Sequence, residues 1–128
     1  MVEESTSHVA RRRRRLTASV TDLEVRRQRA LLISLVRSGD AVGAGKESLR
    51  ELELLTDTAG SEPVEAILVR RERPDAATFI GKGKLSELVA ESHALDVDVV
   101  VFDNELSPAQ QRNLQAAFQC DVVDRVAL

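Results

Sequence analysis

The sequence has few aromatic residues and almost no cysteine. It contains no Trp, no Tyr and three Phe among 128 residues, so it lacks the aromatic side chains on which proteins stack single-stranded bases. Its one cysteine, Cys120, excludes an internal disulfide and fits a reducing compartment. No apolar run approaches the length of a membrane span, and no apolar segment follows the N-terminal arginines as it would in a secretory signal. We therefore expect a cytoplasmic protein without membrane contact.

The net charge of −3 hides a difference between the two ends of the chain. Residues 1–39 carry nine arginines against four acidic residues, whereas residues 40–128 carry nine basic and 17 acidic residues. Five arginines are consecutive, from Arg11 to Arg15, and a run of like charges resists packing. The sequence predicts a disordered Arg-rich tail over residues 1–28 and a folded domain over residues 29–128. Charge alone favours a solvated tail without a dedicated partner, and a nucleic-acid or ribosomal surface is the alternative.

Apolar and helical patterns alternate along the rest of the chain, which is typical of crossover units on a parallel sheet. Four stretches predict strands, at residues 30–36, 64–70, 97–102 and 120–126. A loop is expected over residues 38–45, and helices over 46–59, over 84–95 and onward from Ser107. The first and third strands are the least polar, so they should be central. The prediction is an α/β fold with a small open sheet of strand order 2-1-3-4 and helices on both faces, half of a flavodoxin-like domain.

Two glycine-rich stretches imitate phosphate-binding loops. Residues 43–48 end like a P-loop, but Asp40 and Glu47 stand where that loop needs a glycine and a hydroxyl residue, so we reject this site. The run Gly81-Lys82-Gly83-Lys84 begins like a dinucleotide-binding fingerprint, but Ser86 replaces its third glycine. Its glycines either permit backbone angles closed to other residues or, with two lysines at a helix start, attract phosphate. The failed spacing disfavours nucleotide binding, whereas contact with an RNA backbone remains reasonable.

No catalytic or metal-binding group of residues is evident in the sequence. Asp103 and Glu105 follow the third strand at its C-terminal end, where parallel sheets bind ligands. No His or Cys joins them, and polar residues leading into the next helix are the better interpretation. That helix has a clear start signal, with Ser107 as N-cap, Pro108 at the first position and Gln110 completing a capping box. We expect these three residues to serve the fold.

Two longer motifs resemble the N-terminal domain of HflX-type translation GTPases. The first is Pro-Asp-x-x-Thr-Phe-Ile-Gly-x-Gly-Lys, from Pro74 to Lys84. The second is Phe-Asp-x-Glu-Leu-Ser-Pro-x-Gln-x-Arg-Asn-Leu, from Phe102 to Leu114. Val123-Asp124-Arg125 is similar to the start of the run that leads out of that domain. Residues 30–72 fit the family in pattern only, and the arginine tail has no counterpart.

The resemblance implies a domain that helps such proteins bind the large ribosomal subunit and its rRNA, in the splitting or rescue of ribosomes under stress. Full-length relatives use GTP and Mg²⁺ and continue into a helical arm and a GTPase domain, which is a further potential partner. This chain shows no Walker motif, so we expect no GTP hydrolysis and no cofactor in the chain itself. We expect it to be a monomer.

The basic residues near the first motif are the expected contacts to rRNA phosphates: Arg70, Arg71, Arg73, Lys82 and Lys84. Such contacts supply affinity rather than sequence readout. The motif residues expected to serve the fold are Gly81, Gly83, Ser107, Pro108 and Gln110. Two alternatives remain open: a small nucleotide- or ligand-binding domain that uses the Gly81 turn and Asp103, and a protein-interaction module for a GTPase encoded elsewhere.

Overall fold

The computed structural model describes residues 27–128, so residues 1–26, with most of the predicted tail, lie outside the described residues. The elements in chain order are β1 (Arg29–Arg37), α2 (Val42–Thr58), β2 (Glu62–Arg71), α3 (Lys82–Ala94), β3 (Val99–Phe102), α4 (Pro108–Phe118), β4 (Asp121–Asp124) and the short 3₁₀ helix η1 (Arg125–Ala127). Arg27 and Gln28, which the sequence assigned to the tail, already contact the folded part: the Gln28 carbonyl accepts a hydrogen bond from the amide of Glu62 at 2.7 Å.

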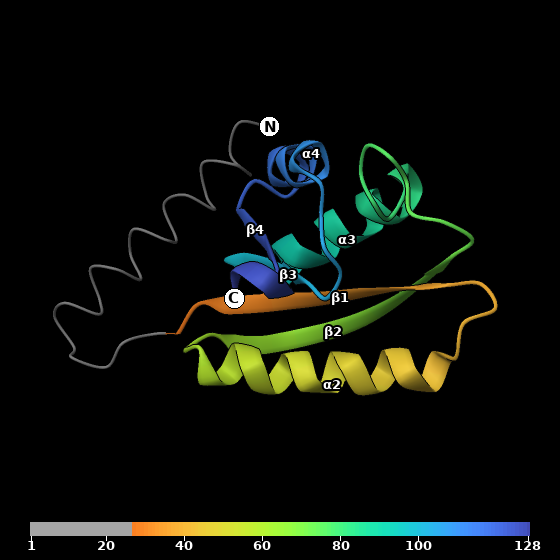
Figure 1. Cartoon of the computed structure of the whole chain (residues 1–128). Coiled ribbons are helices and arrows are strands. Elements are labelled where there is room, and N and C mark those ends of the chain that lie inside the picture. Colours follow the sequence, from red (N-terminus) through yellow and green to blue (C-terminus); the bar gives the residue numbers. More distant parts are fainter. Residues whose placement is uncertain (1–26) are drawn as a thin grey trace, which may run out of the picture.

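The four strands form one parallel sheet in the order β2-β1-β3-β4, as the sequence predicts (Figure 1). α2 lies on one face of this sheet, and α3 and α4 lie on the other, as predicted (Figure 1). β1 and β3 are central, and almost every residue of both is buried. The chain passes from β1 to β2 on one side and then crosses to β3 on the other. The carboxyl ends of β1 and β3 therefore flank a topological switch point, where open α/β sheets bind ligands.

The core consists of two clusters, one on each face of the sheet. The larger cluster joins the sheet to α3 and α4 and includes Leu88, Phe102 and Leu114. The smaller cluster joins the sheet to α2 and includes Leu32 and Leu52. Both central strands contribute to both clusters, which explains why they read as continuous apolar runs rather than as alternating patterns.

The first helix begins earlier than predicted, because Val42 to Gly45 are helical rather than part of a loop. Packing explains the difference. A Cβ placed on Gly45 would lie 2.4 Å from Cγ2 of Val36 and 3.1 Å from Cδ1 of Leu68. The glycine lets α2 approach β1 and β2 closely, so a residue that reads locally as a helix breaker is required by the tertiary contact.

Other element boundaries also differ from the prediction. β3 begins at Val99 rather than Val97, because Asp98 is buried and its carboxylate accepts a hydrogen bond from the Arg29 amide at 2.9 Å. β4 ends at Asp124, whose side chain caps η1 by accepting a hydrogen bond from the Ala127 amide at 3.2 Å. Among residues 27–128, no helix has the length and apolar character needed to cross a membrane.

Candidate functional site

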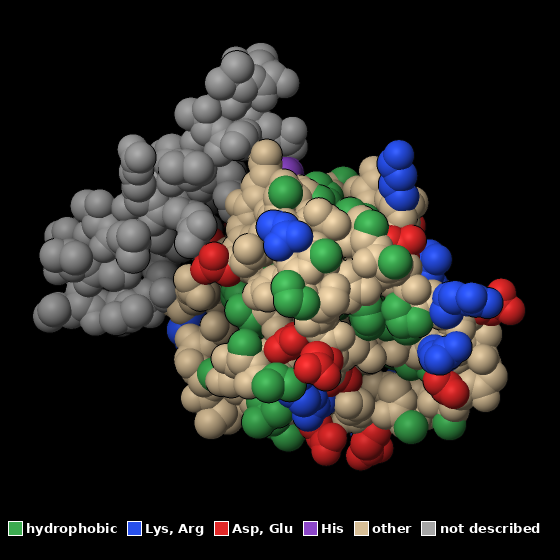
Figure 2. Space-filling view, turned by 45° about the horizontal axis from the view of Figure 1, so that its top comes forward, with side chains coloured by type: hydrophobic (Ala, Val, Ile, Leu, Met, Phe, Trp, Pro, Cys, Tyr) green, Lys and Arg blue, Asp and Glu red, His purple; other side chains and the backbone are tan. Residues whose placement is uncertain are grey.

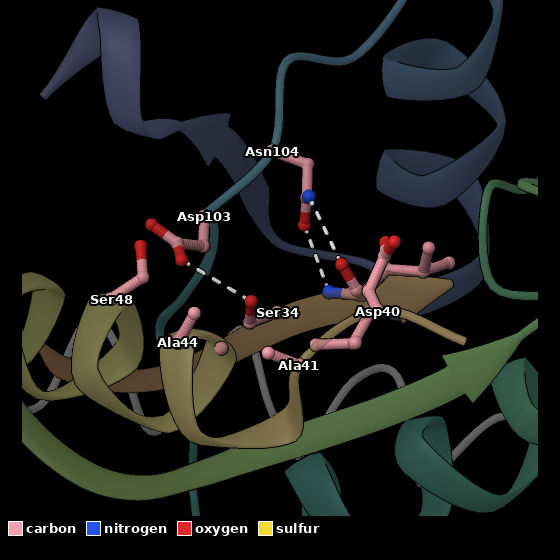
Figure 3. A pocket seen from close by; sticks show the side chains of 10 residues that line it. Ser34, Asp40, Ala41, Ala44, Ser48, Asp103 and Asn104 are labelled. Carbon is pink, nitrogen blue, oxygen red and sulfur yellow. Dashed lines mark hydrogen bonds between the residues drawn. The ribbon is translucent and has the colours of Figure 1, made fainter. Parts of the chain in front are cut away.

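A cavity of about 470 Å³ lies at the switch point, between the carboxyl ends of β1 and β3 and the first turns of α2. Figure 3 shows Ser34 from β1, Ala44 and Ser48 from α2, and Asp103 and Asn104 from the segment after β3 converging on it. Small residues on α2 leave the space open. We call this cavity the switch-point pocket.

Most polar side chains of the switch-point pocket are already engaged. The hydroxyl of Ser34 donates to Oδ2 of Asp103 at 3.2 Å (Figure 3). Nε of Arg125 donates to Oδ1 of Asp103 at 2.6 Å. The Arg125 guanidinium also donates to the carbonyl of Ser48 at 2.8 Å and to its hydroxyl at 3.0 Å. The Asp103 side chain is 5% exposed. Asp103 therefore holds η1 and α2 to the sheet, rather than lying free as a base or a metal ligand.

Asn104 lies two residues after the end of β3 and continues the pairing with β1 through its side chain. Its Oδ1 accepts a hydrogen bond from the Leu35 amide at 2.9 Å, and its Nδ2 donates to the Leu35 carbonyl at 3.2 Å (Figure 3). The side chain imitates a strand residue and closes the end of the β1–β3 pair. Within residues 27–128, no group of three or more His, Cys, Asp or Glu side chains could hold a metal ion.

The predicted basic residues gather at the ends of β1 and β2 and the start of α3. The strand register sets Arg37 beside Arg71, and the Arg71 guanidinium reaches Gly81 at the start of α3. We call this group the basic cluster: Arg37, Arg70, Arg71, Arg73, Lys82 and Lys84. Figure 2 shows Lys and Arg side chains gathered on the side of the molecule where Figure 1 has these strand ends and the start of α3.

Arg71 differs from the other members because its guanidinium is turned inward. Its Nε donates to the carbonyl of Arg73 at 3.1 Å, and its Nη1 donates to the carbonyl of Ile80 at 3.2 Å. These bonds join β2, the following loop and the start of α3 into one unit. Arg70, Arg73 and Lys82 are exposed, whereas Lys84 is half-buried and forms an ion pair with Glu87 at 3.4 Å.

Arg37 was missed by the sequence reasoning. It is the last residue of β1, and its Nε donates to the carbonyl of Glu72 at 3.0 Å. The predicted strand order could have revealed it. The first and second strands are neighbours in that order, and neighbouring parallel strands end side by side, so Arg37 must lie close to Arg70 and Arg71.

The two glycines of the first motif have different roles. Gly81 has φ of +87°, the positive value expected for a glycine-specific turn. A Cβ at Gly81 would lie 1.9 Å from Nη1 of Arg71. Gly83, however, lies inside α3 without a positive φ, and a Cβ there would meet nothing within 4 Å. Gly81 therefore uses the backbone freedom of glycine, whereas Gly83 does not.

The two family-like motifs meet in space. Ser107 caps α4 with both halves of the predicted capping box, and Pro108 opens the helix. The Gln110 side chain also donates to the carbonyl of Asp75 at 2.8 Å, and Asn113 donates to the carbonyl of Ala77 at 2.9 Å. The second motif thus pins residues 74–80, which we call the Asp75 loop, beside the basic cluster.

The Asp75 carboxylate organises its own loop. It accepts hydrogen bonds from the Thr78 amide at 2.7 Å, the Thr78 hydroxyl at 3.1 Å and the Ala77 amide at 2.9 Å. The bond from the Thr78 amide, followed by the other two and the charge of Arg71, lowers the pKa of Asp75 below its ordinary value of 3.8.

We predict that the Asp75 loop keeps its contacts down to acidic pH and loosens only as Asp75 protonates below pH 3.8. Because the folded-state pKa is lowered, the stabilisation is present above the unfolded value and is lost as pH falls through the folded one. Carboxyl ¹³C shifts of Asp75, followed by NMR titration, measure this pKa. An Asp75→Asn variant should remove the acid-dependent change in the Thr78 amide signal, and a transition that persists in that variant would contradict the assignment.

Comparison with known proteins identifies the domain. The model of a family described as "GTP-binding GTPase N-terminal" matches residues 46–128. The chain belongs to this GTPase N-terminal domain family. Its curated relatives carry the name GTPase HflX, which confirms the resemblance seen in the two motifs.

The HflX relatives are similar in sequence but much longer. Identity is 44% over 98 residues with the protein of Lacrimispora saccharolytica, covering 77% of this chain and 23% of that protein. Identity is 42% over 82 residues with the protein of Escherichia coli, covering 64% of this chain and 19% of that protein. It is 36% over 101 residues with the protein of Flavobacterium psychrophilum, covering 79% of this chain and 24% of that protein. The chain therefore spans about a quarter of the length of such relatives.

A solved structure shares the fold. The crystal structure of the complex of SsGBP with GDP matches with a TM-score of 0.57 and 17% sequence identity, over 79% of this chain and 27% of that chain. At this identity the likeness supports the α/β fold and its topology, and says nothing further about activity.

Proposed function

We propose that this domain helps an HflX-type GTPase to bind the large ribosomal subunit during ribosome splitting or rescue under stress, and that the domain itself does not hydrolyse GTP. Family membership supports the GTPase context, and the observation that carries the ribosomal role is the basic cluster. Its exposed members Arg37, Arg73 and Lys82 lie at one corner of the fold, where β1 and β2 end and α3 begins. Arg70 is exposed too, but it alternates with Arg71 along β2 and so projects to the α2 side of the sheet, as Leu68 does. Exposed cations at such a corner are suited to bind the phosphate groups of rRNA.

Hydrogen bonds that hold the backbone beneath it distinguish the basic cluster from scattered surface charge. Arg71 ties the end of β2 to the start of α3, and α4 holds the intervening Asp75 loop through Gln110 and Asn113. Side chains that project from a fixed backbone lose less conformational freedom on binding than side chains on a loose segment. The cluster also lies at the N-terminus of α3, whose free amide groups add to its attraction for anions.

A double charge reversal tests the proposal. We predict that Lys82→Glu with Lys84→Glu weakens binding to purified large subunits about tenfold or more, because two cations near phosphates become anions, and lowers the slope of log affinity against log salt by about two. Affinity is measured by fluorescence anisotropy of the labelled chain across a salt series.

The matched control reverses two charges on the opposite side of the sheet. Lys46 and Arg50 are exposed on α2, and their change to Glu should alter affinity far less than the Lys82 and Lys84 pair. Equal losses in the two double variants would show that only net charge matters, and unchanged binding in the Lys82 and Lys84 variant would remove the basic cluster from the interface.

The switch-point pocket supports a second candidate, a small-ligand function. It lies where open α/β sheets bind ligands, but Gly81 is not among the residues that line it. Of its two carboxylates, Asp40 and Asp103, the second is paired with Arg125. A thermal-shift screen of the chain against nucleotides and other small metabolites tests it, since a ligand that binds only the folded state raises the melting temperature. Replacing Ala44 by Phe, to fill the pocket, should abolish any such shift.

A further inference from the structure

β2 is a long strand at the edge of the sheet. It has ten residues, and among residues 27–128 its only neighbouring strand is β1 (Figure 1). The Arg71 carbonyl points toward β1, because it accepts a hydrogen bond from the amide of Ser38, which follows β1. Backbone groups alternate in direction along a strand, so the amides and carbonyls of Ala66, Leu68 and Arg70 point away from β1. These three residues offer a template on which a further strand can pair.

The middle of this edge is apolar without being fully buried. Ala66, Ile67 and Leu68 are half-buried, whereas nearly every residue of β1 is buried. The Glu65 carboxylate accepts a hydrogen bond from the Ala66 amide at 3.2 Å, so a side chain occupies the position that a neighbouring strand would take. Pro63 protects only the beginning of the strand. Proteins usually cover or pair an apolar edge of this length.

The charges along β2 decide which strand it fits. Glu62 and Glu65 lie in its first half, and Arg70 and Arg71 lie at its end. A second copy of β2 running antiparallel brings each acidic half beside a basic half, whereas a parallel copy brings like charges together. Such a pair has two-fold symmetry, which is the commonest symmetry of assemblies of identical chains. β2 is therefore complementary to itself.

The backbone directions and the charges favour one register. Residues whose backbone groups point outward must lie opposite one another, and this condition is met when Leu68 faces Leu68 of the second copy. Glu65 then lies opposite Arg71 of the second copy, at the distance of a cross-strand side-chain pair. Nε and Nη1 of Arg71 donate to carbonyls of their own chain, which leaves Nη2 to donate to this carboxylate. Ile67 meets Val69 of the second copy in the same register.

We infer that two copies of this domain associate through β2, as an antiparallel β2–β2 pair centred on Leu68 that continues the sheet from one copy into the other. On pairing, Glu65 exchanges the Ala66 amide of its own chain for Arg71 of the second copy. One strand supplies most of the contact, so the association is weak and depends on protein concentration. This dimer replaces the monomer that the sequence suggests.

Cysteine cross-linking tests both the association and its register. Leu68→Cys places two thiols on directly opposite residues, whose Cα atoms are about 5.5 Å apart in an antiparallel pair, within reach of a disulfide. Ala66→Cys is the matched control, because the two copies of residue 66 lie four residues apart along the strands, at ~13 Å. Under mild oxidation, Leu68→Cys should give a covalent dimer and Ala66→Cys should not. The unsubstituted chain, whose Cys120 is 9% exposed, gives the background.

Sedimentation velocity across a concentration series measures the association without cross-linking. The unsubstituted chain should pass from monomer to dimer as its concentration rises. Glu65→Arg should raise the dimer dissociation constant about tenfold or more, because the change turns two attractive cross-strand pairs into repulsive ones. Glu51→Arg makes the same charge change at an exposed position of α2, and it should alter the constant no more than about twofold. Circular dichroism of both variants verifies that they are folded.

Three results would overturn the inference. A chain that stays monomeric at its highest soluble concentration would show that β2 does not pair with a second copy, and would leave this edge to an extended segment of another protein. Cross-linking of Ala66→Cys as efficient as that of Leu68→Cys would contradict the register. Equal weakening by Glu65→Arg and Glu51→Arg would show that net charge, rather than contact along β2, controls the association.

Discussion

Replacing Gly81 by Ala is expected to lower the free energy of unfolding by about 3 kcal/mol, from backbone strain at a positive φ together with the loss of charged hydrogen bonds. Gly81 has φ of +87°, and a Cβ there would lie 1.9 Å from Nη1 of Arg71. The guanidinium would have to leave the carbonyls of Arg73 and Ile80. One methyl group therefore loosens the joint between β2, the Asp75 loop and α3.

Urea unfolding followed by circular dichroism measures this change, and Gly83→Ala provides the control two residues away. Gly83 is helical with open space around it, so its replacement should stabilise the domain by about 0.5 kcal/mol, because alanine is the better helix former. Similar urea midpoints for Gly81→Ala and Gly83→Ala would contradict the role of Gly81 in connecting β2, the Asp75 loop and α3. Gly81→Ala should also reduce ribosome affinity under conditions where the domain stays folded.

Replacing Arg125 by Ala is expected to cost about 2 to 3 kcal/mol of stability, since removing one partner of a buried ion pair leaves the other charge uncompensated. The Asp103 carboxylate is 5% exposed, whereas the Arg125 side chain is 30% exposed, so water offsets part of the loss. The change also removes the hydrogen bonds to Ser48 that fasten η1 to α2. The expected damage is local to the switch-point pocket.

Chemical unfolding of four variants separates the ion pair from a general effect of arginine removal: Arg125→Ala, Asp103→Asn, the double variant that combines them, and Arg112→Ala as a control. Arg112→Ala, at an exposed position on α4, should change stability by no more than about 0.5 kcal/mol. Asp103→Asn in the Arg125→Ala background should recover part of the loss, because the amide needs no counter-charge. If the double variant loses as much stability as the two single variants together, Asp103 and Arg125 are not coupled and the account of the ion pair is contradicted.

The sheet could be predicted from the sequence because its signal is local. Residues 31–36, apart from Ser34, and residues 99–102 are all apolar, and only strands covered on both faces require this. The polar residues of β2 and β4 mark them as edges, which fixes the order once crossovers are right-handed. The start of α4 could also be predicted, because the N-cap Ser107, Pro108 and the capping-box residue Gln110 all act within one helical turn.

The contacts of the candidate site could not be predicted, because they join residues far apart in the sequence. Nothing near Gly45 indicates that Val36 and Leu68 crowd it. Nothing near Asp103 indicates an ion pair with Arg125 or a bond from Ser34. Charge counting placed Arg71 among the phosphate contacts, whereas the structure turns its guanidinium toward the backbone of the Asp75 loop. Motif residues such as Gln110 have long-range partners that only the fold reveals.

Co-sedimentation of the unsubstituted chain with purified large ribosomal subunits, across a salt series, tests the central claim most directly. The account predicts binding that saturates at about one copy per subunit and weakens steeply as salt rises. It also predicts that replacing Arg11 to Arg15 by Gln leaves a saturable component carried by the basic cluster. Absence of binding at low salt, or complete loss of binding when only those five arginines are replaced, would contradict a ribosome-binding role for the folded domain.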